Sequence, residues 1–196
     1  NKETWLVYNA GQDEFPTDEV MRNAKALIIP GSPDSAHKDD EWLVKTRIWL
    51  DKFHKEYTKT KYLGVCFGEQ IICHSIGGKS DCMAERKEDP KFFIRRVEEI
   101  EISPEFFELK FMKKNIGLIP NKLKITEAHG DEVSELPKDF VRYGGSASCK
   151  IELLASKDER YFGIQSHPEF AIEYLMARKT VMMAFYGKQA LTNEYW

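Results

Sequence analysis

The stretch Lys61–Ser75, with the sequence KYLGVCFGEQIICHS, decides the fold of this chain. Its residues 62–65 predict a short β-strand, and the run from Glu69 to Ile76 predicts a helix. Cys66 lies at the junction, without a longer turn between the strand and the helix. A strand that passes directly into a helix is typical of an α/β domain.

Two glycines bracket this cysteine. Gly64 precedes Cys66 by two residues and Gly68 follows it by two, which is the spacing of a nucleophile elbow. Such a turn needs residues without a Cβ on both sides of the pivot. The helix N-terminus beneath the thiol should lower its pKa, so we expect Cys66 to be partly thiolate near neutral pH. The alternative interpretation is a buried structural cysteine, the common role of a lone cysteine.

The residues before this stretch continue the α/β pattern. Thr4–Tyr8 predicts a short strand, and the apolar run Ala26–Ile29 predicts a strand buried on both faces in a parallel sheet. The loop Gly31–Ser35 comes next, and Asp40–Tyr57 has the spacing of an amphipathic helix. This alternation of strands and helices predicts a doubly wound α/β domain.

The second half of the chain predicts several strands joined by short loops, which we expect to form a mixed or antiparallel region leading back into the main sheet. A short helix is predicted over Pro104–Met112 and a last amphipathic helix over Ile172–Tyr186. No repeat or linker divides the chain, so residues 1–196 are predicted to form a single domain. The predicted strands are Phe92–Ile102, Leu123–Ala128, Val141–Tyr143, Ile151–Leu154 and Tyr161–Gln165.

Composition and charge argue against several classes of function. A net charge of −3, without a stripe of Lys and Arg interleaved with aromatic residues, argues against nucleic acid as a ligand. No apolar run approaches the length of a membrane-spanning helix. The four cysteines form no C-x-x-C pair and no Cys/His cluster with zinc spacing, so we predict no metal or cofactor and expect a reducing, cytoplasmic compartment. Because Asn1 is not an initiator methionine, we expect that preceding residues were removed or left out.

A cysteine nucleophile needs a base that takes its proton and later returns it to the leaving group. Of the five histidines, only His129 and His167 follow predicted strands, where open α/β sheets place their ligand sites. Pro168 keeps the backbone extended, so His167 and Glu169 should point to the same side, and the carboxylate could orient the imidazole. Alone, this tripeptide favours a packed histidine beside a solvated glutamate; together with the elbow it favours a catalytic pair.

Three motifs together resemble the class I, or triad, glutamine amidotransferase family. They are GVCFGEQ at 64–70, AHGDEV at 128–133 and HPE at 167–169, and they occur in family order. The segments Gly31-Ser32-Pro33 and Gly77-Gly78-Lys79 fit the same pattern, so the resemblance covers most of the chain. It implies a three-layer, flavodoxin-like domain with a mixed sheet. Within the family, the chain is most similar to free-standing γ-glutamyl peptidases, whereas AHGDEV resembles the GMP-synthetase-like branch.

The resemblance implies a role for each matching residue. Cys66 would attack a γ-glutamyl carbonyl and form a thioester, with His167 as general base and acid and Glu169 as its orienting carboxylate. The oxyanion would be held by the backbone N–H groups of Ser32 and Phe67. The remaining substrate-binding or site-shaping residues would be Gly31, Gln70, His129 and Asp131.

Two departures from the family pattern affect these expectations. Glu69 stands where the family often has histidine, and its charge would oppose thiolate formation although it suits the helix N-terminus. Family members usually begin with one more βα unit ahead of Thr4, so this first unit is expected to be missing here.

We expect cysteine-dependent hydrolysis of a small γ-glutamyl amide such as glutamine or a glutathione-like compound, by a free-standing γ-glutamyl peptidase. The alternatives are a glutaminase subunit that supplies ammonia to a separate synthetase, and a non-catalytic structural or binding subunit of an assembly.

Overall fold

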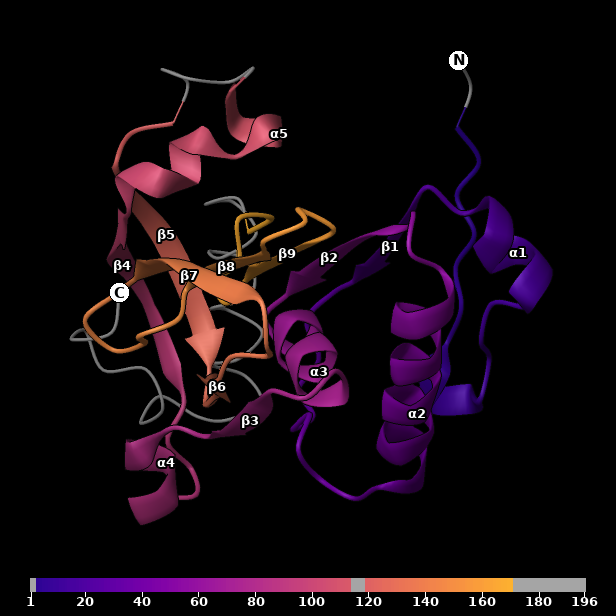
Figure 1. Ribbon diagram of the computed structural model, residues 1–196. Coiled ribbons are helices and arrows are strands. Elements are labelled where there is room, and N and C mark those ends of the chain that lie inside the picture. Colours follow the sequence, from indigo (N-terminus) through magenta and orange to yellow (C-terminus); the bar gives the residue numbers. More distant parts are fainter. Residues whose placement is uncertain (1–2, 114–118, 171–196) are drawn as a thin grey trace.

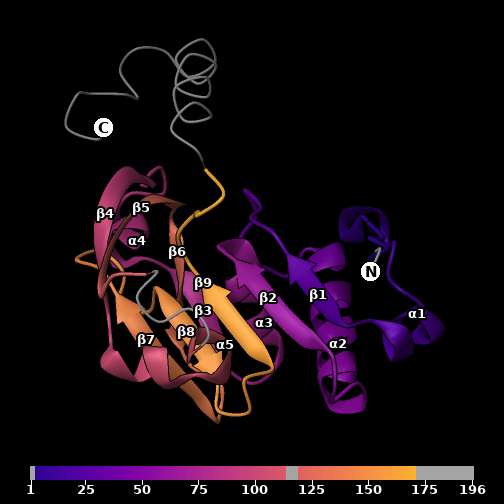
Figure 2. The same cartoon turned by 90° about the horizontal axis from the view of Figure 1, so that it is seen from above.

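The computed structural model describes residues 3–113 and 119–170, which form an α/β structure around a curled, mixed sheet of seven strands (Figures 1 and 2). The first three strands of the sheet run parallel, and all the remaining pairs are antiparallel. In order across the sheet, the strands are β1 (Ala26–Ile29), β2 (Lys61–Val65), β9 (Tyr161–Ile164), β8 (Leu153–Ser156), β7 (Phe140–Gly145), β4 (Ile94–Ile102) and β5 (Lys122–His129).

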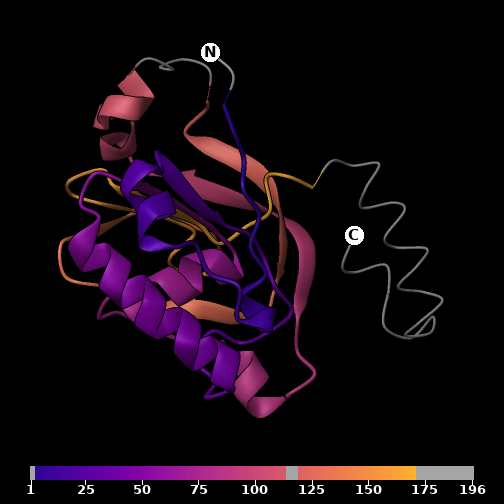
Figure 3. The ribbon, with the colours of Figure 1, turned by 90° about the vertical axis from the view of Figure 1, so that its right-hand side faces the viewer.

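Helices cover both faces of this sheet. Helix α3 (Phe67–Ser75) packs on the parallel half, and α2 (Glu41–Glu56) packs on α3 (Figures 1 and 3). The 3-10 helix η2 (Pro104–Glu108) and α5 (Lys110–Lys113) contribute to the core on the other face. The remaining elements are η1 (Ala10–Gln12), α1 (Asp18–Asn23), α4 (Ala84–Glu88), and the antiparallel pair β3 (Lys79–Cys82) and β6 (Asp131–Glu135).

The alternation of side chains along β9 divides the core between the two faces. Tyr161 stacks on Tyr62 with ring centroids 4.3 Å apart, in the cluster formed with α2 and α3. Phe162 and Ile164 point to the opposite face and pack with Phe106 of η2. Because a strand alternates its side chains with a period of two, the register that builds both cores also sets the position of the residues just beyond β2 and β9.

The N-terminal part differs from the prediction in two respects. Residues 4–8 form no strand, since no strand of the described chain pairs with them, and Trp5 and Val7 are 70% and 93% exposed. Strand propensity alone does not order a segment that lacks a partner edge. Burial of Ala26–Ile29 on both faces is also wrong: β1 is the edge strand, and Ile28 is 42% exposed.

Most other predicted elements are present close to the expected bounds. The strand expected at Ile151–Leu154 begins at Leu153, and the helix expected over Pro104–Met112 is divided into η2 and α5. The short β3, α4 and β6 were not predicted, because they carry too few apolar residues to show a period. The helix predicted over Ile172–Tyr186 lies outside the described residues. Among the helices of the described ranges, none has the length and apolar character required to cross a membrane.

Candidate active site

The turn from β2 into α3 forces Cys66 into an unusual backbone conformation, with φ of 51° and ψ of −110°. Such a conformation costs a non-glycine residue about 1–3 kcal/mol and persists only where the surrounding structure enforces it. A Cβ on Gly64 would lie 2.5 Å from the backbone nitrogen of Glu69, and one on Gly68 would lie 1.9 Å from the carbonyl oxygen of Ile29. Neither glycine can carry a side chain, so the elbow results from close packing of β1, β2 and α3.

Burial, more than the helix dipole, sets the protonation of the Cys66 thiol. The residue is 5% exposed, and this desolvation raises the pKa of Cys66 to about 12. The backbone N–H of Phe67 and the side chain of Gln165 act in the opposite direction, while the carboxyl groups of Glu69 and Glu127 raise the pKa further. The expectation of a partly thiolate Cys66 is therefore wrong for this structure, because desolvation outweighs the helix N-terminus.

His167 and Glu169 lie together after β9, with 2.7 Å between His167 Nδ1 and Glu169 Oε1. If Glu169 is ionised it only accepts, so Nδ1 carries the hydrogen and Nε2 is left as the basic nitrogen. The ring of Phe170 stacks on the imidazole with centroids 4.2 Å apart. A Cβ on Gly31 would lie 2.9 Å from His167 Cε1 and 3.7 Å from the Cβ of Cys66, so Gly31 permits the close approach of both residues.

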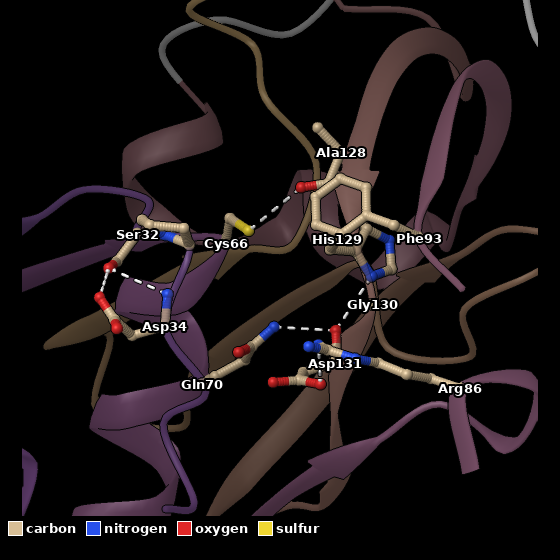
Figure 4. A pocket seen from close by; sticks show the side chains of 11 residues that line it. Ser32, Asp34, Cys66, Gln70, Arg86, Phe93, Ala128, His129, Gly130 and Asp131 are labelled. Carbon is tan, nitrogen blue, oxygen red and sulfur yellow. Dashed lines mark hydrogen bonds and ion pairs between the residues drawn. The ribbon is translucent and has the colours of Figure 1, made fainter. Parts of the chain in front are cut away.

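The thiol and the imidazole are close but not hydrogen-bonded in the described structure. Instead, Cys66 Sγ points at the carbonyl oxygen of Ala128, 3.8 Å away (Figure 4). Catalytic hydrogen bonds are often long or poorly aligned before the substrate binds. The predicted contact between Cys66 and His167 therefore stays a prediction for the substrate complex.

A small cavity of about 20 Å³ lies beside Cys66 (Figure 4). Ser32 from the loop after β1 and His129 from the end of β5 line it, together with Asp131 of β6. This volume is about that of a single water site, so the cavity by itself is too small to enclose a γ-glutamyl group.

Gln70 connects three parts of this site. Its Nε2 donates to the backbone oxygen of Asp131 and to Oε1 of Gln165, each at 2.9 Å. Both amide hydrogens of Gln70 are thus used within the protein, where they hold the elbow helix against β6 and the end of β9. Contact between Gln70 and a substrate remains a prediction.

The loop after β1 is ordered by its own hydrogen bonds. Ser32 Oγ donates to Asp34 Oδ2 at 2.6 Å and accepts from the backbone N–H of Asp34 at 3.2 Å. Ser32 and Cys66 both line the cavity, which is where an oxyanion hole formed by the backbone of Ser32 and Phe67 would have to lie.

Sequence reasoning missed two residues near the thiol. Arg86 of α4 lines the cavity and pairs with Asp131, with Nη1 and Oδ1 2.6 Å apart. Nothing in the charged run around Arg86 distinguishes it from a solvated surface. Gln165 could have been recognised, because a polar amide at the end of an apolar strand needs a buried partner. In the structure Gln165 is 0% exposed.

The structure also changes the interpretation of Glu69. Its side chain is 1% exposed, and neither carboxyl oxygen has a hydrogen-bond partner among the described residues. Burial, followed by the nearby carboxyl groups of Glu152 and Glu127, raises the pKa of Glu69 well above its usual value. Burial therefore disfavours the negative charge that was expected at the helix N-terminus.

Two groups of described side chains have metal-binding atoms close together. One is the partly exposed group His37, Asp81 and Cys82, in which Asp81 is already paired with Lys87. The other is the fully buried group Glu127, His129 and Glu152.

One known protein family matches most of this chain. The model of the family described as glutamine amidotransferase class-I matches residues 6–178. The chain belongs to this family. Solved structures agree on the fold: a glutamine amidotransferase from Thermotoga maritima superposes with a TM-score of 0.71 at 16% identity, over 94% of this chain and 73% of that one.

Curated members of the glutamine amidotransferase family give finer matches. Gamma-glutamyl peptidase 3 of Arabidopsis thaliana is 30% identical over 173 residues, which is 88% of this chain and 66% of that protein. A GMP synthase [glutamine-hydrolyzing] of Neisseria meningitidis is 29% identical over 157 residues, or 80% of this chain and 26% of that protein. The chain spans 62–66% of the length of the four Arabidopsis peptidases that it matches.

Proposed function

We propose that this protein hydrolyses γ-glutamyl amide bonds through a γ-glutamyl thioester on Cys66. The observation that carries the proposal is the convergence of three segments at the C-terminal ends of adjacent parallel strands. Gly31 follows β1, Cys66 follows β2 and His167 follows β9, and a Cβ on Gly31 would lie within 4 Å of both Cys66 and His167. A strained nucleophile next to an oriented imidazole is the arrangement that acyl transfer needs.

The chemistry divides into acylation and hydrolysis. On substrate binding, His167 Nε2 takes the thiol proton of Cys66, and the sulfur attacks the γ-carbonyl carbon. The backbone N–H groups of Ser32 and Phe67 stabilise the resulting oxyanion. The imidazolium, supported by Glu169, then gives its proton to the leaving nitrogen as the C–N bond breaks. In the second stage His167 deprotonates a water, which attacks the thioester and releases glutamate and the thiol.

The raised pKa of Cys66 is compatible with this sequence of steps. A thiol that keeps its proton in the unliganded site is protected from other electrophiles, and it needs a base only when a carbonyl group is in place. As a consequence, deprotonation of Cys66 depends strictly on His167. A thiolate formed without help would not need the imidazole as a base, although the leaving nitrogen would still need a proton from it.

The charges around the cavity suit the far end of a γ-glutamyl group. That end carries an α-ammonium and an α-carboxylate a short distance apart. Asp131 and Arg86 line the cavity, with 2.6 Å between Asp131 Oδ1 and Arg86 Nη1. The carboxylate of Asp131 could bind the α-ammonium, and the guanidinium of Arg86 could bind the α-carboxylate. We propose that these two side chains exchange part of their mutual ion pair for contacts with the substrate.

Of the γ-glutamyl hydrolases, we propose a free-standing peptidase, supported by the names of the Arabidopsis relatives. The test is turnover by the full-length protein of glutathione, a γ-glutamyl anilide and glutamine, with Cys66→Ser as the control. We expect the peptidase substrates to be cleaved at least as well as glutamine, and the serine variant to be inactive. Comparable activity in the serine variant would refute the thioester.

A glutaminase that supplies ammonia to a synthetase is the second candidate. The similarity to GMP synthases and the small size of the cavity favour it, because such a site is completed by its partner. Activity limited to glutamine that rises sharply when a synthetase is added would select this candidate. Absence of turnover with every substrate and partner, in a folded protein, would leave the non-catalytic subunit.

A further inference from the structure

Three side chains converge in the interior behind the cavity. Glu127 and His129 belong to β5, and Glu152 directly precedes β8. The residues are 0%, 2% and 0% exposed, respectively, and their potential ligand atoms all lie within 4.8 Å of one another. The hydrolysis mechanism gives none of the three a chemical step.

The hydrogen bonds of His129 define where its lone pair points. Nδ1 lies 2.9 Å from the backbone oxygen of Asp131, and a carbonyl oxygen only accepts, so Nδ1 carries the hydrogen. In the neutral imidazole only one ring nitrogen carries a hydrogen, and the other carries a lone pair. Nε2 is therefore an acceptor, and it faces Glu127 Oε2 at 3.2 Å. Two acceptors that face each other in the protein interior need a cation or a proton between them.

Three of the four carboxyl oxygens around this nitrogen also lack a hydrogen-bond donor among the described residues. Among the described residues, no hydrogen bond reaches His129 Nε2, either carboxyl oxygen of Glu127, or Oε2 of Glu152. The other oxygen of Glu152 accepts from Ser146 Oγ at 2.6 Å. A fully buried group with this many open acceptors lacks the donor or cation that such atoms need.

We propose that Glu127, His129 and Glu152 bind a divalent metal ion of the zinc or manganese class. Two ligand atoms that are each about 2.1 Å from one ion lie about 3.0–3.4 Å apart, and the separation of Glu127 Oε2 and His129 Nε2 falls in this range. Two carboxylates and one imidazole suit zinc or manganese, and their charges cancel that of the ion.

The surroundings of the three residues support the same assignment. A metal-bound histidine almost always donates its second ring N–H to a carboxylate or a backbone carbonyl, as His129 does toward Asp131. Ser146 holds the Glu152 carboxyl in the same way. The ion would tie the end of β5 to the start of β8, and so fix the segment 128–131 that lines the cavity.

The experiment measures metal content without any substrate, so it is independent of the proposed hydrolysis. Full-length protein is produced with added zinc or with added manganese, purified without chelator and analysed by plasma mass spectrometry. We expect about one ion per chain in the wild type and less than about a tenth of an ion in Glu127→Gln and Glu152→Gln. The matched control is the double variant His37→Gln, Cys82→Ser, which removes the other metal-type group and should keep the ion.

A second measurement covers variants that fold poorly. Because the site is closed, the ion must enter as the chain folds, so wild-type protein is unfolded in chelator and refolded with or without zinc. Zinc should raise the melting temperature of the wild type and of the control variant, but not that of Glu127→Gln. A wild type with less than about a tenth of an ion and a melting temperature independent of both metals would refute the site. Loss of the ion in the control variant would do the same.

Discussion

The inner pair, Glu127 and His129 at the end of β5, and the outer pair, His167 and Glu169 after β9, consist of the same two residue types at the same spacing. Their surroundings differ. The Glu169 side chain is 48% exposed, whereas that of Glu127 is 0% exposed. The imidazole of the outer pair is bound to its own glutamate through Nδ1, and that of the inner pair to a backbone carbonyl.

These differences give the two histidines different chemistry. In the outer pair, a partly solvated carboxylate can support a transient positive charge on the ring, and Nε2 can exchange a proton with the substrate. In the inner pair, Nε2 faces a buried acceptor, and any proton or cation held there is shielded from solvent. A glutamate two residues from a histidine is thus no functional signature until burial and the partner of Nδ1 are known.

Replacing each histidine by asparagine should separate the pairs most clearly. We expect His167→Asn to lower kcat/KM by about 10³-fold or more, because the thiol then has no base. His129→Asn should cost at most about tenfold in kcat/KM and act mainly on stability, because it removes a buried hydrogen bond. Steady-state kinetics and thermal melts on both variants test this. Equal loss of turnover in two folded variants would contradict the assignment of the base.

The pH dependence of Cys66 alkylation is expected to give the next largest effect. With the pKa of Cys66 near 12, the thiolate fraction and hence the labelling rate should rise about tenfold per pH unit, or about a hundredfold between pH 7 and 9. Iodoacetamide labelling followed by mass spectrometry measures the rate at this site. Cys82→Ser is the suitable background, since Cys82 is the most exposed of the four cysteines. A rate that levels off below about pH 8 would show that the helix N-terminus outweighs burial.

The predictable part of this fold is the part in which local sequence and tertiary contacts agree. The elbow could be predicted from Gly64 and Gly68, because a Cβ at either position would meet the backbone of α3 or β1. The pairing of His167 with Glu169 could be predicted from the extended backbone at Pro168.

The rest depended on contacts that no local pattern records. The strand expected at residues 4–8 needed a partner strand that the described chain does not provide. The thiolate expected at Cys66 failed because burial is a property of the whole packed site. The buried carboxyl groups of Glu127 and Glu152 are 25 residues apart, so no ligand spacing in the sequence could link them.

Removing the charge of Glu169 while His167 remains should lower activity less than removing His167. We expect Glu169→Gln to lower kcat/KM by about tenfold, less than for a buried triad carboxylate, because solvent compensates for part of its charge. Glu169→Asp should recover part of the loss if a carboxylate is what the imidazole requires. Kinetics over about pH 6 to 9 on the three proteins provide the measurement. Wild-type activity in Glu169→Gln would show that the contact only packs the strand end.

The smallest expected effect concerns Glu69, whose carboxyl group is buried near the inner pair. Burial and the neighbouring carboxyl groups raise the pKa of Glu69, so the folded protein keeps this proton at pH values where the unfolded chain has released it. The folded state then binds more protons than the unfolded state, and stability falls as the pH rises above about 4.5. One such group changes the free energy of unfolding by at most about 1.4 kcal/mol per pH unit.

Glu69→Gln removes this dependence, and its new amide adds only an offset that does not vary with pH. The melting temperature of Glu69→Gln relative to wild type should therefore rise as the pH increases from about 5, by about 2–4 °C for each kcal/mol. Both proteins are first unfolded in chelator and refolded without metal, which keeps metal binding out of the comparison. A difference that stays constant over this range would mean that Glu69 is ionised in the folded protein.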